Sequence, residues 1–487
     1  MVKRILIFSA ALLTSLTVAH AQVKLPHVIS DNMVIQQDTD VRLWGWDKPN
    51  KTVKVTTSWN SNTVTTRAGK DGKWEVKVRS PKASYTPLTI TFDDGTPVSV
   101  KNVVAGEVWV CAGQSNMQFP IKGFPNCPLE GYADVVAEAN QYSQKIRYCK
   151  VPDQVSMTPL EDTQCSWKAT DINTVADQSA VGYFFARMVS NTLNIPVGLV
   201  EANKGGSRVE SWLNEANLKK YTDEPLDSVT MVNRYEYDYY RPMVWGYGTF
   251  SPIEKYTVKG ILYYQGCSNV DYHMDKYAER LAVLVKQWRD AFGEGDIPFY
   301  FVQIAPYAYG DDPNGTSSAF IREQQIKATD LIPNSGLVCT NDLTYSWERQ
   351  QIHPCKKKPV GERLAYFALN RDYGFKSVLC ESPRYKEMFV QNDTCYVSFD
   401  NTYGGMSRFN DIEGFEVAGS DHVFHKAQVG HFWVPTADKR NETFYVTSPE
   451  VKHPVAVRYC FRNVEQGNLK NNANLPLFPF RTDNWKE

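Results

Sequence analysis

A serine that follows a short apolar run is the first residue whose position indicates chemistry. Ser115 comes two residues after Gly113, and residues 108–112 before that glycine are all apolar. The run predicts a buried strand, and the glycine predicts a tight turn at its end. Open α/β sheets bind ligands just outside the carboxyl ends of their strands, so Ser115 would lie beside a ligand, with its amide able to face an anion. The alternative is an ordinary loop serine.

Two later loops, each after a predicted strand, carry groups that stabilise negative charge. Gly205 and Gly206 are paired glycines, which let a backbone amide approach a ligand closely. One such amide could join that of Ser115 in an oxyanion hole. Gln265 and Asn269 have side-chain amides that could donate to an oxyanion or to substrate hydroxyls. A plain turn and a polar loop without a ligand are the respective alternatives.

A histidine in a third loop is a candidate general base. Of the eight histidines, only His273 and His353 lie where strands and helices alternate. His353 follows a strand by a long loop and precedes a predicted helix, a position from which an imidazole can accept a proton. The alternative is a solvated loop histidine. His422 and His425 lie on a predicted hairpin, where paired histidines are usually solvated, so we expect no metal site.

These loops need a parallel sheet to bring them to one edge. Between residues 104 and 374, short apolar runs alternate with amphipathic segments, which predicts parallel strands covered by helices on both faces. We expect strands at 197–202, 259–264, 298–304 and 336–340, and helices at 177–193, 275–292 and 359–369. The predicted fold class is therefore α/β, with residues 104–374 as the central domain.

All-β sequence flanks this domain on both sides. Residues 22–103 contain short, largely alternating runs separated by turn residues, which predicts a small β-sandwich. Residues 375–487 return to this pattern and end in an irregular tail, and this second β-module could pack against the first. A chain of 487 residues is long enough for such an arrangement.

Residues 1–21 have the pattern of a secretory signal peptide. Lys3 and Arg4 form a positive start, residues 5–18 are largely apolar, and residues 19–21 form a small-x-small cleavage site. No later stretch approaches the roughly 20 apolar residues of a membrane-spanning helix, so we expect export to the periplasm or the cell exterior. The formal charge of −1 gives no sign of a nucleic acid or an acidic membrane as partner. The oligomeric state stays open.

Short sequence blocks with specific composition occur along nearly the whole chain after residue 21. They are residues 30–37 with Trp44-Gly45-Trp46, Ala112-Gly113-Gln114-Ser115-Asn116-Met117, Gly205-Gly206-Ser207 with Glu210 and Trp212, Tyr264-Gln265-Gly266 with Ser268-Asn269, Ile352-His353-Pro354, residues 448–451 with 454–459, and residues 479–483. In this order they resemble the blocks of the sialate O-acetylesterase family, which belongs to the wider SGNH hydrolases.

The resemblance implies a flavodoxin-like, three-layer SGNH hydrolase core between two β-sandwich-like modules, and removal of O-acetyl groups from sugars without a cofactor. It implies that Ser115 is the nucleophile and His353 the base. The oxyanion hole would consist of the amides of Ser115 and Gly206 with a side chain from Gln265 or Asn269. The residues that it places at the substrate are Gln114, Asn116 and Glu210.

The first departure from the family pattern concerns the group that orients the histidine. The family commonly has an aspartate two residues before it, and this chain has Gln351. A glutamine cannot stabilise an imidazolium by charge, and an amide in place of the aspartate costs roughly 10⁴ in turnover in the chymotrypsin-type triad that the field uses as its reference. Asp342, Glu348 or a backbone carbonyl could substitute, and a Ser–His dyad is a further possibility.

The other departures are two cysteines and a tyrosine. Cys267 stands where the family has a glutamate, and Cys355 where it has a polar residue. The exported context permits disulfides, so Cys267 and Cys355 could form one that ties two site loops together; two separate thiols are the alternative. Tyr247 replaces a frequent asparagine, and we expect its phenol to reshape the acyl or sugar pocket.

Three functions fit these observations. A secreted carbohydrate O-acetylesterase is favoured, with sialic acid or an acetylated plant or host polysaccharide as substrate. A glycan-binding homologue with impaired catalysis is supported by Gln351 and Cys267. An SGNH esterase for lipid or thioester acyl groups is disfavoured by the block around Ser115.

Overall fold

The computed structural model describes residues 22–310, 315–407, 411–432 and 442–485, so the predicted signal peptide lies outside the described residues. A central sheet has the strand order β13-β12-β11-β7-β10-β8-β9, and all its pairs are parallel except that of the edge strand β9. The strands are β7 (Val98–Gly113), β8 (Ile146–Lys150), β9 (Trp167–Ala169), β10 (Val197–Asn203), β11 (Gly260–Tyr264), β12 (Phe299–Val302) and β13 (Ser335–Val338).

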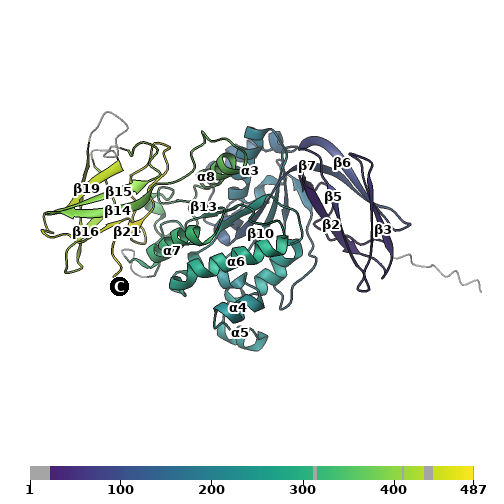
Figure 1. Ribbon diagram of the computed structural model, residues 1–487, viewed down its shortest axis with the longest axis horizontal. Coiled ribbons are helices and arrows are strands. Elements are labelled where there is room, and N and C mark those ends of the chain that lie inside the picture. The colour runs from purple at the N-terminus through teal and green to yellow at the C-terminus, as the bar shows by residue number, and fades with distance from the viewer. Residues whose placement is uncertain (1–21, 311–314, 408–410, 433–441, 486–487) are drawn as a thin grey trace, which may run out of the picture.

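Helices cover both faces of this sheet, with α3 and α8 on one face and α6 and α7 on the other (Figure 1). The helices are α1 (Ser115–Gln118), α2 (Tyr132–Glu138), α3 (Ala180–Leu193), α4 (Glu215–Tyr221), α5 (Ser228–Arg234), α6 (Tyr277–Phe292), α7 (Ser317–Leu331) and α8 (Lys358–Phe367). This arrangement confirms the α/β fold class and its three layers. None of the described helices is both long and apolar enough to cross a bilayer.

One helix that the sequence did not indicate is α7. Its core-facing positions include the buried polar side chains of Arg322 and Gln325. Gln325 accepts a hydrogen bond from the backbone of Ile304 and donates to that of Gln265, and the Arg322 guanidinium donates to the carbonyl of Arg462. Because these polar groups replace apolar ones on the buried face, the helical periodicity of hydrophobic residues is absent.

Strand β7 connects the central sheet to the N-terminal β-module. Its first half pairs with β6 and β1 of the module, and its second half lies between β10 and β11. The burial pattern changes accordingly, from partly exposed to buried on both faces. The other strands of the module are β1 (Val34–Gln36), β2 (Asp40–Trp46), β3 (Thr52–Thr57), β4 (Thr63–Arg67), β5 (Lys73–Arg79) and β6 (Ser84–Asp93).

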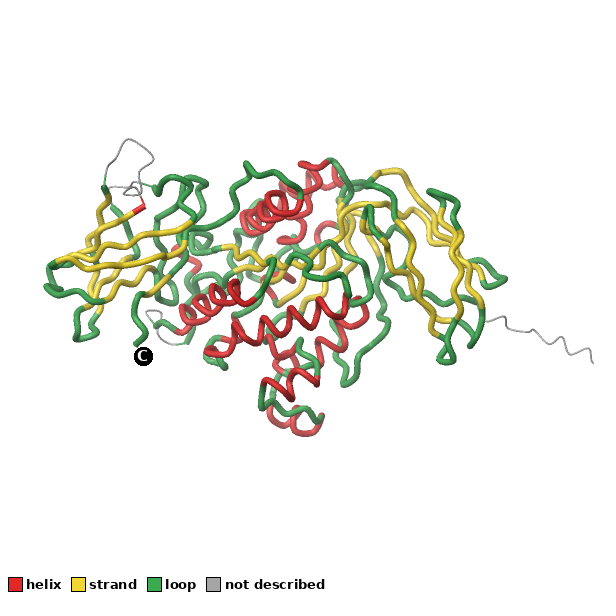
Figure 2. The backbone as a smooth tube through the Cα atoms, viewed as in Figure 1, coloured by secondary structure: helices red, strands yellow, loops and turns green. Residues whose placement is uncertain are grey.

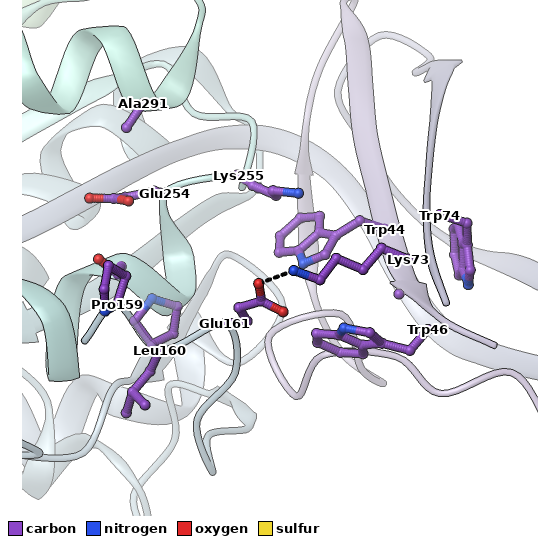
Figure 3. Close-up of a pocket in the computed structure, with 13 residues that line it drawn as sticks. Trp44, Trp46, Lys73, Trp74, Pro159, Leu160, Glu161, Glu254, Lys255 and Ala291 are labelled. Carbon is purple, nitrogen blue, oxygen red and sulfur yellow. Dashed lines mark hydrogen bonds and ion pairs between the residues drawn. The ribbon is translucent and has the colours of Figure 1, made fainter. Parts of the chain in front are cut away.

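A cavity of about 280 Å³ lies where this module meets the core. Figure 3 shows Lys73 of the module reaching Glu161 of the core beside Trp44 and Trp46. The rings of Trp44 and Trp74 are only 4% and 3% exposed. Trp44 and Trp74 are therefore packed inside the protein and expose little of their surface to a ligand, whereas Trp46 is only partly buried.

The C-terminal module consists of two four-stranded antiparallel sheets whose apolar side chains share one core. The strands are β14 (Arg384–Gln391), β15 (Thr394–Asp400), β16 (Phe415–Ala418), β17 (Phe424–Lys426), β18 (Gln428–His431), β19 (Thr443–Thr447), β20 (Ala456–Tyr459) and β21 (Phe480–Arg481). The two β-modules lie at opposite ends of the helix-covered core (Figure 2). The expectation that the two modules could pack against each other is therefore wrong. The second module packs against the central domain instead, where Arg481 forms an ion pair with Glu323 of α7.

Candidate active site

The turn after β7 places Ser115 at the carboxyl edge of the parallel sheet. Gly113 has φ +132°, and a Cβ atom there would overlap the backbone of Tyr264 in the neighbouring strand β11. The amide of Gln114 donates to the Tyr264 carbonyl over 2.9 Å, which fixes the turn. Ser115 follows as the first residue of α1, so a strand, a glycine turn and a helix position its hydroxyl.

The structure brings Ser115 and His353 together although they are 238 positions apart. Nε2 of His353 lies 2.8 Å from Oγ of Ser115. The imidazole packs against Phe124 and Phe119, with ring centroids 5.1 and 6.3 Å away. Burial and, secondarily, the positive charge of Lys357 lower the pKa of His353 to about 4. At neutral pH the imidazole is therefore unprotonated and in position to accept the serine proton.

The loop after β10 places two glycines beside the serine. A Cβ atom on Gly205 would lie 3.5 Å from Cβ of Ser115. Gly206 has φ +80°, and a Cβ atom there would lie 2.6 Å from the ring of Tyr239. The Gly205 amide donates to the Gln118 side chain over 2.8 Å. The amides of Ser115 and Gly206 donate no hydrogen bond within the part of the chain that the structure describes, so both remain open to a ligand.

The side chains of Gln265 and Asn269 do not complete this oxyanion hole. The Gln265 amide group donates to the carbonyl of Ser207 over 3.1 Å and to Oδ1 of Asn269 over 2.8 Å. Nδ2 of Asn269 donates to Glu210 over 3.0 Å. Both side chains are buried, and their donors brace the glycine loop from behind. The prediction that one of them donates to an oxyanion is therefore wrong for this arrangement.

Two of the three residues expected at the substrate are engaged inside the protein. Glu210 forms a buried ion pair with Arg280, with 2.6 Å between Oε1 and Nη1. Removing such a charge from its partner is costly, so Glu210 is not available to a sugar. Oε1 of Gln114 accepts a hydrogen bond from the amide of Gly266 over 2.9 Å. The predictions that Glu210 and Gln114 bind the substrate are therefore wrong, because these side chains hold the site loops together.

The third, Asn116, links the serine helix to the histidine loop. Its Oδ1 accepts a hydrogen bond from Nζ of Lys357 over 2.6 Å, and its Nδ2 donates to the carbonyl of Ile352 over 3.0 Å. Asn116 thus positions His353 and does not face the substrate. Lys357 is only 1% exposed, and burial lowers its pKa to about 7. Sequence reasoning missed it, because a run of three lysines at 356–358 does not show which of them is buried.

Neither acid proposed to orient the histidine reaches it. Asp342 forms two 2.8 Å contacts with the guanidinium of Arg363 and a 2.9 Å ion pair with Lys470. The carboxylate of Glu348 accepts hydrogen bonds from two backbone amides of its own loop. Both predictions are wrong, because each carboxylate has other partners. No carboxylate among the described residues pairs with His353.

The Nδ1 side of the imidazole faces a thiol. Sγ of Cys127 lies 3.9 Å from Nδ1 of His353. The same thiol donates to Oε1 of Gln351 over 3.3 Å, and that oxygen also accepts from the backbone amide of His353 over 3.1 Å. The side chain of Gln351 therefore contacts His353 in two ways: directly at the His353 backbone amide, and indirectly through the Cys127 thiol.

The disulfide considered between Cys267 and Cys355 is not formed, and the alternative of two separate thiols holds, since all ten cysteines are free thiols. Cys267 is buried beside Asn116, with 3.9 Å between Sγ and Nδ2. Sγ of Cys355 lies 3.8 Å from the carboxylate of Glu130. The two thiols have different neighbours, so they do not tie the two site loops together.

An aromatic cluster adjoins the glycine loop. Tyr237 stacks on Tyr239, with ring centroids 5.1 Å apart and the planes 8° from parallel. Tyr237 is 48% exposed, so one of its faces is open to solvent. The Arg208 guanidinium lies over the rings of Tyr240 and Tyr272 at 4.1 and 3.4 Å. Exposed aromatic rings beside a hydrolytic site are suited to stacking on sugars.

Tyr247 is not part of this cluster. Its hydroxyl accepts a hydrogen bond from the amide of Glu215 over 2.9 Å, which holds the phenol at the start of α4.

Among the described residues, no group of three or more histidine, cysteine or acidic side chains is arranged so that it could hold a metal ion.

Comparison with known proteins identifies the family. Residues 105–370 match the model of a family described as carbohydrate esterase, sialic acid-specific acetylesterase. The chain belongs to this family. The match spans the central domain from the second half of β7 to the end of α8, and so includes Ser115, Gly206 and His353.

Relatives of this carbohydrate esterase family resemble the chain over most of its length. The sialate O-acetylesterase of Homo sapiens is 27% identical over an alignment of 397 positions that covers 73% of this chain and 72% of the human protein. That of Mus musculus is 26% identical over 460 residues, covering 80% and 81%. The crystal structure of a carbohydrate acetylesterase from Xanthomonas citri covers 95% of this chain and 100% of its own, with 30% identity and a TM-score of 0.84. The chain is thus a carboxylic ester hydrolase that acts on O-acetylated carbohydrate.

Proposed function

We propose that this esterase removes O-acetyl groups from sugars with Ser115 as nucleophile and His353 as general base. The 2.8 Å contact between Ser115 Oγ and His353 Nε2 is the observation that supports the proposal most directly. The lowered pKa of His353 supports it further, because only a neutral imidazole can take the serine proton.

The reaction then proceeds in two halves. Nε2 of His353 accepts the Ser115 proton while Oγ attacks the acetyl carbonyl carbon. The amides of Ser115 and Gly206 donate to the oxyanion of the tetrahedral intermediate, which collapses as the imidazolium returns the proton to the departing sugar oxygen. In the second half, water loses a proton to His353 and attacks the acetyl-enzyme. Acetate leaves, and the proton returns to Ser115.

The sugar is proposed from the relatives and from the aromatic cluster. The mammalian relatives are named sialate O-acetylesterases, and the Xanthomonas citri relative is a carbohydrate acetylesterase. We therefore infer acetylated sialic acid or an acetylated polysaccharide as substrate, with the open face of Tyr237 stacking on a sugar ring. The leader pattern of residues 1–21 supports export to the periplasm or the cell exterior.

Acetate release is the test of this proposal. The chain from residue 22 onward would be assayed with phenyl acetate, O-acetylated sialic acid and acetylated xylan, beside Ser115→Ala and His353→Gln. We expect wild-type release that falls by about 10³-fold or more in both variants, since the two residues act as a unit. Release that survives in folded Ser115→Ala would refute the nucleophile. A folded wild type that releases no acetate would favour the glycan-binding homologue instead.

A further inference from the structure

A chain of contacts runs from the serine through the histidine to a cysteine and a glutamine. The Ser115–His353 contact lies on one side of the imidazole, and the Cys127 thiol lies on the other, 3.9 Å from Nδ1. The thiol hydrogen is directed to Oε1 of Gln351, 3.3 Å away. The line of contacts has the same order as a serine–histidine–acid triad, with a thiol in the place of the acid.

The cysteine is held in position by a tight turn. Backbone hydrogen bonds join Phe124 and Cys127 in both directions, over 3.1 and 2.9 Å. Asn126 within this turn has φ +63°, and a side chain on Gly123 would overlap the Cys127 carbonyl. The turn presents two side chains to the imidazole, the ring of Phe124 and the thiol of Cys127.

Gln351 is bound to the same turn. Its Nε2 donates to the carbonyl of Asn126 over 3.5 Å, while its Oε1 accepts from Cys127 and from the amide of His353. Because Oε1 already has two donors, the glutamine has no free acceptor aimed at Nδ1. The thiol is the group that lies between the glutamine and the imidazole.

We propose that Cys127 is the positioning residue for His353, and that its thiol accepts the hydrogen bond from Nδ1–H which a carboxylate accepts in a conventional triad. The inference rests on the proposed role of His353 as base. Donation of the thiol hydrogen to Gln351 leaves the sulfur lone pairs to face Nδ1–H. Nε2 is then the unprotonated nitrogen that faces Ser115. No proton reaches the sulfur during turnover, since Nδ1–H is retained when Nε2 accepts the serine proton.

A neutral thiol orients the ring without stabilising its charge. A carboxylate beside an imidazole favours the protonated form, whereas a thiol does not. The direction of the His353 pKa, below its ordinary value, agrees with this difference. The 3.9 Å separation is long for a hydrogen bond, and contacts of this kind shorten when substrate binds and the imidazole becomes charged.

The kinetic test compares four changes in the full-length mature chain. Cys127→Ala should lower kcat for phenyl acetate by about three- to tenfold, the worth of one neutral hydrogen bond, with KM nearly unchanged. Cys127→Ser should restore most of the loss, because a hydroxyl can make both contacts. Adding Gln351→Asp to Cys127→Ala should raise kcat again and move the acid limb of the pH profile upward. Cys355→Ala is the matched control, since this thiol lies two positions from His353 but contacts Glu130.

A second measurement does not depend on turnover. The ¹⁵N shifts of histidine-labelled protein report the tautomer of His353, assigned by its loss in His353→Gln. We expect Nδ1 to carry the hydrogen in wild type and a mixture of tautomers in Cys127→Ala. An unchanged tautomer in folded Cys127→Ala, or serine performing no better than alanine, would overturn the role of Cys127. Failure of the proposed function shows separately, as a wild type without activity or a fully active Ser115→Ala.

Discussion

The esterase should keep its activity at pH values where an ordinary histidine would already be protonated. Protonated His353 cannot accept the Ser115 proton, so kcat/KM should follow the fraction of neutral imidazole in the free enzyme. Burial lowers the pKa of His353, and the nearby charge of Lys357 adds to the effect, giving a value of about 4. The active form is thus present above pH 4 and is lost as the pH falls through that value.

The size of the effect follows from the pKa. At pH 5, about 90% of a group with a pKa of about 4 is neutral, against about 3% of a histidine with the ordinary value of 6.5. The two cases differ about 30-fold in kcat/KM at this pH. Phenyl acetate is a suitable substrate because the released acetate can be quantified directly at each pH.

Lysine variants separate the causes of the shift. Lys357→Met removes the charge that lowers the pKa of His353, so the acid limb should move to higher pH. Lys358→Met is the matched control, because this lysine is exposed and its amino group lies 4.0 Å from the carboxylate of Glu362. An acid limb near 6.5 in wild type would refute the burial argument. A limb that stays in place in Lys357→Met would refute the contribution of that charge.

Three further outcomes are expected. Gly113→Ala should lower the free energy of unfolding, measured in urea, by about 3 kcal/mol, because its Cβ atom would overlap Tyr264. Gly95→Ala is the control, since Gly95 also has a positive φ but has no neighbour within 4 Å, and it should lower this free energy less. Equal losses of stability in the two variants would contradict the overlap. Tyr237→Ala should raise the KM for an acetylated polysaccharide about two- to tenfold and leave the KM for phenyl acetate unchanged, because only the sugar stacks on the exposed ring. Equal changes in KM for both substrates would argue against stacking. The neighbouring Cys165 thiol and burial raise the pKa of the Cys149 thiol, which indicates that the two sulfurs lie close together. Oxidised glutathione should therefore join them, seen as the loss of two hydrogen masses and a gain of about 3 kcal/mol for a loop of about 15 residues, and two thiols that remain alkylatable would exclude the bond.

Local sequence was sufficient for the features that depend on neighbouring residues. Continuous apolar runs predicted the strands found as β10 to β13, and amphipathic periodicity predicted α3, α6 and α8, because a buried strand or a half-buried helix selects its side chains locally. Helix α7 was missed for the same reason, since its buried Arg322 and Gln325 find their partners in other segments.

The sequence by itself determined the α/β class, the family resemblance and the loops in which chemistry could take place. Only the tertiary structure decided which polar groups in those loops are free. Glu210, Asp342 and Glu348 look available in the sequence, but distant partners or nearby amides occupy each carboxylate. Cys127 carries no signal of its own, and it meets His353 because a turn 226 positions away in the chain packs against the imidazole. Which groups form hydrogen bonds depends on which residues lie close together in the folded chain, and the order of residues in the sequence does not give this proximity.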